Sequence, residues 1–181
     1  MTSSTQRFLN YNFGLKNESK VSHIFNVSIL THFTIFLLVL LLSETVGLWF
    51  VMTQLNIPVG RETATMWVYQ MSVVTTLIGI MVIPYRASII AAERMSIFAY
   101  VSILEVALKL VVVLVLSYMS FDNLVMYSIL LTLVALLNFF IYQIECRRKL
   151  SFTKYHFVWD KSQYKEMMSF SSWYLFGGMA M

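Results

Sequence analysis

Two ionisable residues, Glu105 and Lys109, lie four positions apart in an otherwise apolar stretch. At that spacing both side chains occupy one face of a helix, with the acid on the N-terminal side, and they can form an ion pair. Charged groups at membrane depth are costly and normally face a cavity or a partner. The pair therefore predicts either a self-neutralised contact packed between helices or the lining of a hydrophilic lumen.

Two other polar residues interrupt apolar runs. Glu44 lies between Ser43 and Thr45, and a carboxylate there fits either a proton or cation site or a buried acid held by a hydrogen bond from a neighbouring helix. Asn138 lies in a later run, where an amide commonly forms hydrogen bonds between helices. Both are candidates for the lining of a cavity.

The elements that must hold these residues are membrane-spanning helices. Apolar residues make up 59% of the chain and charged residues 12%, and the mean hydropathy is +0.72. A helix needs about 20 apolar residues to cross a hydrocarbon core of about 30 Å. Four stretches are long enough, residues 21–52, 64–83, 97–119 and 124–144. Barrel strands would alternate in polarity and these stretches do not, so the predicted fold is all-α, a polytopic membrane helical bundle.

The rest of the chain divides around these spans. Residues 1–20 form a leader, residues 21–145 hold the four spans, residues 146–165 form a basic linker, and residues 166–181 hold the start of a fifth helix. Asp160, with Gln163 three residues later, matches a capping box that begins this fifth helix. Pro84 is expected to end or kink the second span just before a basic loop.

Lysine and arginine residues are distributed unevenly over the connections. Eleven of the thirteen fall in the leader, in the connection between the second and third spans, and in the linker. These are Arg7, Lys16, Lys20, Arg86, Arg94, Arg147, Arg148, Lys149, Lys154, Lys161 and Lys165. Basic residues near the ends of spans stay on the cytoplasmic side. We therefore expect the N-terminus and the segment after residue 146 in the cytoplasm.

The sequence shows no motif for catalysis or metal binding. It has no glycine-rich phosphate loop, no His-Glu-x-x-His and one cysteine, Cys146, and its three histidines are far apart. We therefore predict no enzyme activity, no catalytic residues, no metal and no cofactor. The net charge of +4 follows from topology, and nucleic-acid binding would need a basic, aromatic-rich soluble surface, so no nucleic-acid partner is expected.

Four stretches resemble a family of transporters. They are residues 5–9 (TQRFL), residues 42–50 (LSETVGLWF), residues 83–95 and residues 159–170. Together they resemble the bacterial polysaccharide-export branch of the multidrug/oligosaccharidyl-lipid/polysaccharide (MATE-like) exporter superfamily. That family has twelve to fourteen helices in two lobes. The resemblance aligns the four spans with family helices three to six and residue 167 with the start of helix seven, so the sequence is expected to be a fragment of an exporter.

The resemblance implies a function in the bacterial inner membrane. A transporter of this family flips an undecaprenyl-diphosphate-linked oligosaccharide across the bilayer by alternating access, for O-antigen or capsule biosynthesis. Lys109, balanced by Glu105, would then be a cation of the cavity. Arg7, Arg86 and Arg94 would attract the head group at the cytoplasmic mouth, unless they serve only as topology anchors. Expected partners are membrane lipid, the lipid-linked oligosaccharide, and the polymerase or glycosyltransferases of the same pathway.

Three alternatives stay open. A multidrug or cation antiporter of the same fold would use Glu44 or Glu105 as its coupling site. A noncatalytic membrane scaffold would act through a partner complex. A membrane transferase would turn over a lipid-linked sugar, although such enzymes usually place acidic, histidine or arginine clusters in sizeable loops and the loops here are short.

Overall fold

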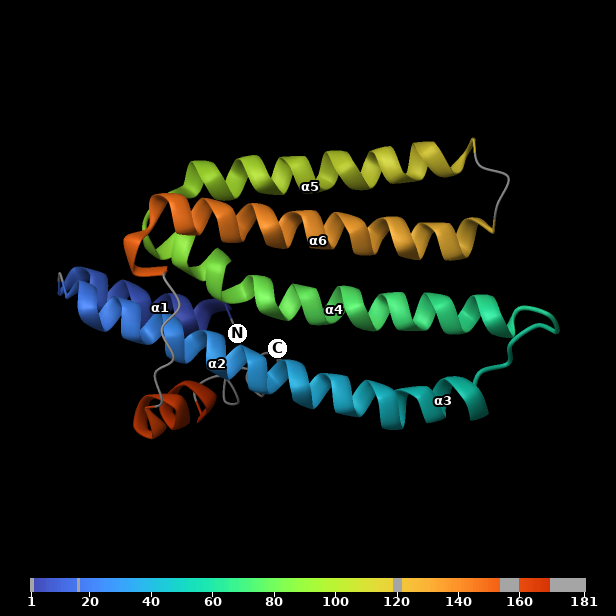
Figure 1. Ribbon diagram of the computed structural model, residues 1–181, viewed down its shortest axis with the longest axis horizontal. Helices are drawn as coiled ribbons and strands as arrows, with labels where there is room; N and C mark the ends of the chain where they lie inside the picture. The colour runs from blue at the N-terminus through green and yellow to red at the C-terminus, as the bar shows by residue number, and fades with distance from the viewer. Residues whose placement is uncertain (1, 16, 119–121, 154–159, 170–181) are drawn as a thin grey trace, which may run out of the picture.

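The computed structural model describes residues 2–15, 17–118, 122–153 and 160–169, and its regular structure within these ranges is entirely helical. The elements in chain order are α1 (Thr2–Gly14), α2 (Glu18–Leu42), the π-helical turn η1 (Ser43–Gly47), α3 (Leu48–Thr53), α4 (Glu62–Ala91), α5 (Met95–Leu116), α6 (Asn123–Lys149), the 3₁₀ turn η2 (Ser151–Thr153) and a short helix over residues 161–169. Figure 1 shows the long helices lying side by side. The chain forms an all-α bundle, as predicted.

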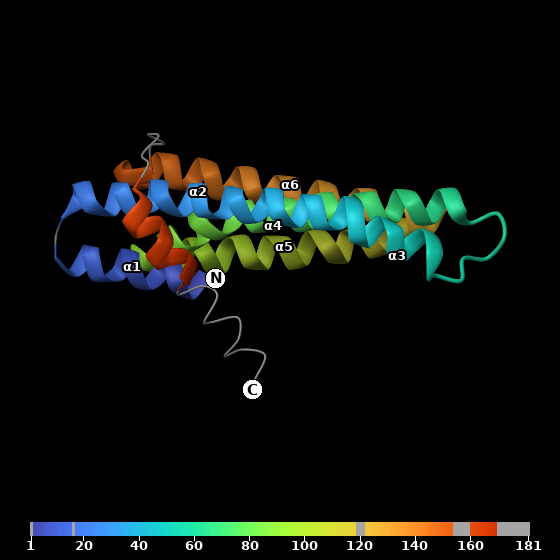
Figure 2. The ribbon, with the colours of Figure 1, turned by 90° about the horizontal axis from the view of Figure 1, so that it is seen from below.

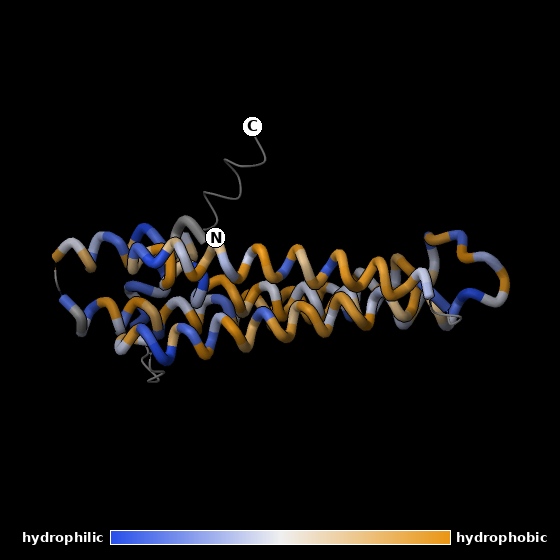
Figure 3. The backbone as a smooth tube through the Cα atoms, turned by 90° about the horizontal axis from the view of Figure 1, so that it is seen from above, coloured by the Kyte–Doolittle hydropathy of each residue, from blue (hydrophilic) through white to orange (hydrophobic). Residues whose placement is uncertain are grey.

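In the described part of the chain, four helices are long and apolar enough to cross a membrane. They are Ser19–Thr53, which is continuous through α2, η1 and α3, and then Glu62–Ala91, Met95–Leu116 and Asn123–Lys149. At 1.5 Å per residue even α5, the shortest, extends about 33 Å, which exceeds the hydrocarbon thickness. Figure 3 shows apolar residues along the middle of the helices and hydrophilic residues gathered near both ends. The four helices fit a multi-pass membrane protein.

The up-and-down course of the helices brings distant segments together at the two ends of the bundle. One end holds α1, the start of α2, the α4–α5 connection and the end of α6, so the three basic segments meet there (Figure 1). At the other end Arg61 forms an ion pair with Asp122. Asp122 also caps α6, because its Oδ1 accepts the backbone N–H of Leu124 at 3.1 Å.

The second span is longer than predicted. It was expected to stop at residue 83, but α4 continues to Ala91 with Pro84 inside it. Proline has no N–H and removes one helical hydrogen bond. The residues that follow are nevertheless fully buried, namely Ala87, Ser88 and Ile89. Their packing outweighs the lost bond, and α4 bends near this point instead of ending (Figure 1).

Part of the expected linker, residues 146–165, is helical. Its first residues belong to the end of α6, and its last residues begin the helix over residues 161–169, which starts directly after the predicted cap Asp160. Residues 154–159 and 170–181, which include most of the expected fifth helix, lie outside the described residues. Asp160 caps helix 161–169, since Oδ1 accepts the backbone N–H groups of Ser162 and Gln163 at 3.0 and 3.2 Å. Gln163 Oε1 has no hydrogen-bond partner among the described residues, Asp160 included, so the reciprocal bond of a capping box is not formed.

The leader folds as a helix, which the sequence did not predict. α1 lies alongside the first part of α2 and against α4 (Figure 2). Its Leu9 is fully buried with Val21, Ile24 and Ala87. Thr5 Oγ1 lies 3.0 Å from Ser28 Oγ, a buried hydrogen bond between α1 and α2. The leader is therefore part of the packed end of the bundle.

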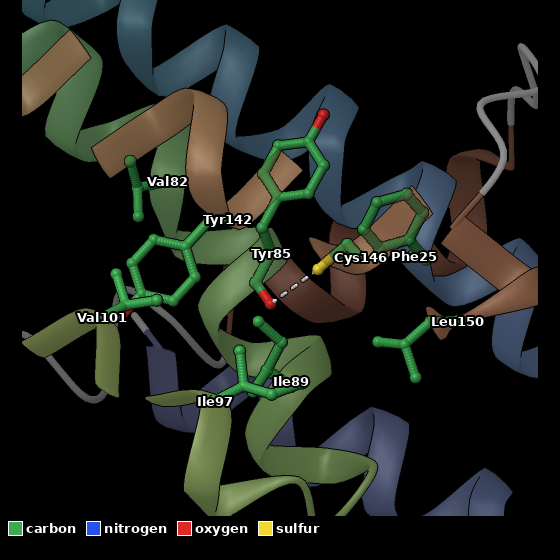
Figure 4. Packing of buried hydrophobic residues seen from close by; sticks show 9 residues of the cluster. All are labelled: Phe25, Val82, Tyr85, Ile89, Ile97, Val101, Tyr142, Cys146 and Leu150. Atoms are coloured by element: carbon green, nitrogen blue, oxygen red, sulfur yellow. Dashed lines mark hydrogen bonds between the residues drawn. The ribbon is translucent and has the colours of Figure 1, made fainter. Parts of the chain in front are cut away.

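The main apolar core lies at the same end. Figure 4 shows side chains from α2, α4, α5 and α6 meeting around Tyr85 and Tyr142. Cys146 is fully buried in this cluster, and its Sγ donates to the carbonyl oxygen of Tyr85 at 3.5 Å. Toward the opposite end the helices expose apolar side chains, for example Leu41 and Met52 on the first span. Such a surface suits contact with lipid or with further transmembrane helices.

Candidate functional site

Three of the residues singled out from the sequence meet at one cavity between α4, α5 and α6. Arg86 from α4, Glu105 from α5 and Asn138 from α6 line a space of about 140 Å³. The remaining wall is small or apolar, namely Ile78, Gly79, Val82, Ile83 and Ala135. Helix α4 can bring Arg86 to this place only because it continues past Pro84. Arg86 therefore belongs to a span, and its assignment to the loop after the second span was wrong.

Glu105 is the ionic centre of the site. Lys109 Nζ lies 2.6 Å from Glu105 Oε1, which is the predicted pair one turn apart on α5. Arg86 Nη2 lies 3.9 Å from the other carboxylate oxygen, Oε2. One carboxylate thus faces two cations, and the closer contact is with Lys109. The cluster has a formal charge of +1, and Arg86 is its less completely paired cation.

Two aromatic rings position the guanidinium of Arg86. Its Cζ lies 5.7 Å from the centre of the Phe98 ring on α5 and 5.5 Å from the centre of the Tyr142 ring on α6. Rings at such distances attract a cation through their negative faces, more strongly where water is excluded. Tyr142 is fully buried, so its ring supplies a fixed surface. The arginine is held in place without being neutralised by a second carboxylate.

The site has unused hydrogen-bonding capacity. Within the described part of the chain, the buried atoms Arg86 Nε, Asn138 Oδ1 and Tyr142 Oη have no hydrogen-bond partner. A buried polar group left unpaired costs about 1–3 kcal/mol. Two of these residues, Arg86 and Asn138, line the cavity.

Glu44 lies elsewhere, on the π-helical turn of the first span. Its side chain is exposed, and Gln70 Nε2 on α4 lies 3.3 Å from Glu44 Oε2. The preceding carbonyl, that of Ser43, accepts the hydroxyl of Tyr69 at 2.5 Å. Glu44 was expected to be either a proton or cation site or a buried acid held by a neighbouring helix. The hydrogen bond from the neighbouring helix is present, but the carboxylate is exposed.

The remaining candidates do not join the cavity. Arg94 occupies the N-cap position of α5 and is exposed at the packed end of the bundle. Arg7 is exposed on α1. Neither residue is among those that line the cavity. In the described residues no group of three His, Cys, Asp or Glu side chains is placed to hold a metal ion.

The sequence did not single out Phe98 or Tyr142 as parts of a site. Both are large apolar residues inside apolar stretches, which is typical of ordinary helix packing. One pattern was available, because Asn138 and Tyr142 are four residues apart and so share a face of α6. Arg86, whose guanidinium contacts the Tyr142 ring, lies on α4. Spacing along α6 therefore could not indicate it.

No protein-family model, curated protein or solved structure matches the chain.

Proposed function

We propose that the chain is part of a transporter that moves a lipid-linked oligosaccharide across a bacterial inner membrane by alternating access. The observation on which this rests is Arg86, an incompletely paired guanidinium that lines a cavity between membrane-spanning helices. A diphosphate needs cationic partners, and arginine binds phosphate oxygens through paired N–H groups.

The shape of the substrate fits this assignment. The sugar needs a polar path, the diphosphate needs the positive cluster, and the lipid tail can remain in the bilayer between helices. The resemblance in residues 42–50 and 83–95 supports the same function. The transport step makes and breaks no bond, so the chain is not an enzyme on this proposal.

The test is replacement of the two cations in the gene of the native host. We expect Arg86→Leu and Lys109→Ala to lower surface polysaccharide by about tenfold or more, because each removes a charge-assisted contact worth roughly 1.5–3 kcal/mol. Arg86→Lys and Lys109→Arg should restore part of it. Lys149→Ala is the matched control, since it removes a basic residue from a different ion pair, the one with Glu145 on α6.

Membrane levels of every variant are measured by immunoblot. Normal polysaccharide in both Arg86→Leu and Lys109→Ala, at normal protein levels, would overturn the proposal.

A second function, cation-coupled export of a drug-like compound, is favoured by one observation. Glu44 lies on a π-helical turn, and π-helical turns are frequent at functional sites. On this alternative a proton or cation binds Glu44, and Gln70 holds the carboxylate. Ion-dependent drug resistance that is lost in Glu44→Gln, with polysaccharide unchanged in Arg86→Leu, would favour the antiporter.

A further inference from the structure

A separate cavity lies at the packed end of the bundle, between α1 and the turn that joins α4 to α5 (Figure 1). Its volume is about 710 Å³, within the range of roughly 300–1,000 Å³ that is usual for small-molecule sites. Its polar lining consists of Gln6 and Asn10 from α1 and Glu93 and Arg94 from the turn. Gln6 is half-buried and the other three are exposed, so a ligand can reach them. None of these side chains has a hydrogen bond or ion pair with another described residue.

Glu93 has an unusual backbone conformation. Its φ is +56°, in the left-handed region. The backbone N–H groups of Glu93 and Arg94 donate to the carbonyl oxygens of Ile90 and Ile89, both at 3.0 Å. This pattern ends a helix, and glycine is the usual residue at the left-handed position because it has no Cβ. A strained residue of this kind is often functional, and here the turn alone does not explain why a carboxylate occupies the position.

The turn lies at the depth of the lipid head groups. Helix α5 starts directly after it, at Met95, and has 22 residues. Its length of about 33 Å exceeds a hydrocarbon core of about 30 Å only slightly. The first residue of α5 is therefore close to the edge of the hydrocarbon. Glu93 and Arg94, which precede it, lie among the head groups.

The two charges of the turn select the ligand. The guanidinium of Arg94 binds phosphate oxygens, and the carboxylate of Glu93 accepts hydrogen bonds from an ammonium group. Because the two residues are adjacent, a ligand with a single charge is attracted by one and repelled by the other. A ligand that carries both charges is attracted by both. The amides of Gln6 and Asn10, which share a face of α1, can donate to further oxygens.

We propose that this cavity binds the head group of a zwitterionic aminophospholipid, phosphatidylethanolamine. Its phosphate contacts Arg94 and its ammonium group contacts Glu93. The glycerol and the first methylene groups lie against the apolar wall of the cavity, which includes Phe13, Ile90 and Met95. The site shares no lining residue with the cavity of Arg86, and it does not depend on transport of an oligosaccharide. A soluble zwitterion has the same chemistry, so the experiment separates the two sources.

Native mass spectrometry of the purified protein counts the lipids that stay bound. The protein is mixed with equal amounts of phosphatidylethanolamine, phosphatidylcholine and phosphatidylglycerol that have the same acyl chains. Phosphatidylcholine has no ammonium N–H, and phosphatidylglycerol has no ammonium group. We expect phosphatidylethanolamine to be retained about two- to fivefold better than either, the gain from an exposed ion pair. Glycerophosphoethanolamine, added as a competitor, is the soluble probe.

Variants separate the carboxylate of Glu93 from the backbone it occupies. Glu93→Gly removes the carboxylate but suits the left-handed conformation. The preference for phosphatidylethanolamine should disappear, while the unfolding midpoint in mixed detergent and SDS should rise. Arg94→Leu should lower retention of all three lipids by about two- to fivefold, and Arg94→Lys should restore part of it. Arg148→Leu is the matched control, because it removes an exposed arginine of α6 that does not line this cavity.

Each outcome decides the inference. Equal retention of the three lipids by the parent protein overturns it, and so does a preference that survives in Glu93→Gly. Displacement of the lipid by an equal concentration of glycerophosphoethanolamine means a site for a soluble zwitterion and overturns the assignment to a lipid. A preference that is lost in Glu93→Gly and kept in Arg148→Leu supports the site.

Discussion

At the scale of single residues, Asp160 stabilises two contacts with one carboxylate. Oδ1 accepts the backbone N–H groups at the start of helix 161–169, while Oδ2 lies 3.1 Å from His23 Nε2 on α2. The backbone N–H of Gln163, and then the imidazole of His23, hold the pKa of Asp160 below its ordinary value. A group bound more tightly in its charged form stabilises the structure only while it is charged.

We expect the docking of helix 161–169 on α2 to depend on pH in one direction. Because the folded pKa is lowered, the contribution of Asp160 is fully present above the ordinary aspartate pKa of about 4 and is lost as the pH falls through the lowered value. Spin labels at Lys20→Cys and Lys165→Cys in a Cys146→Ala background should report one short distance at neutral pH and a distribution that broadens progressively as the pH falls below about 4.

Asp160→Asn should give the broad distribution already at neutral pH. Asp122→Asn is the control, because Asp122 caps α6 at the other end of the bundle. A distance distribution that stays the same at every pH, in both Asp160→Asn and the parent, would remove this contact from the docking.

At the scale of elements, the π-helical turn Ser43–Gly47 adapts the first span to α4. The hydroxyl of Tyr69 on α4 donates to the carbonyl oxygen of Ser43. Gly47 makes this approach possible, since a Cβ at position 47 would collide with that same hydroxyl. The glycine is therefore needed for close packing between two helices. Its backbone φ is −66°, an ordinary helical value that any residue can adopt.

Gly47→Ala is expected to destabilise the protein by about 1–3 kcal/mol, the usual cost of overpacking a fitted contact. The measurement is the unfolding midpoint in mixed detergent and SDS. Adding Tyr69→Phe should recover part of the loss, because the clashing oxygen is removed. Gly79→Ala serves as the control for stability, since a Cβ at position 79 meets nothing within 4 Å. Equal losses in Gly47→Ala and Gly79→Ala would contradict this packing.

At the scale of the whole molecule, the arrangement of four spans predicts which segments share a side of the membrane. The leader and the start of α5 lie at one end of the bundle, and residues 54–61 lie at the other (Figure 1). The excess of lysine and arginine at the first end favours its retention in the cytoplasm. Topology and sidedness are therefore testable together.

Labelling of single cysteines with a membrane-impermeant maleimide makes this test. In a Cys146→Ala background, Val59→Cys should be labelled in intact cells, and Val59 is 98% exposed. Leu15→Cys and Met95→Cys should be labelled only after the membrane that holds the protein is permeabilised. The parent Cys146 is fully buried and is expected to stay unlabelled. Labelling of positions 15 and 59 from the same side would contradict the four-span topology.

The all-α class and the existence of four spans followed from the sequence alone. Long apolar runs have one stable solution in lipid, because every backbone N–H and C=O must be paired within the segment. The Glu105–Lys109 pair was predictable for a similar reason, since spacing along one helix determines which side chains meet. The cap at Asp160 was local as well. Each of these features depends on neighbours in the chain.

Only the tertiary structure decided the end of α4 and the composition of the site. Pro84 weakens a helix locally, and the buried contacts that carry α4 on to Ala91 come from other helices. The same holds for Arg86, whose partners Glu105, Phe98 and Tyr142 lie on α5 and α6. Contacts between helices depend on how the helices are aligned and rotated against one another, and no spacing within a single segment encodes that arrangement.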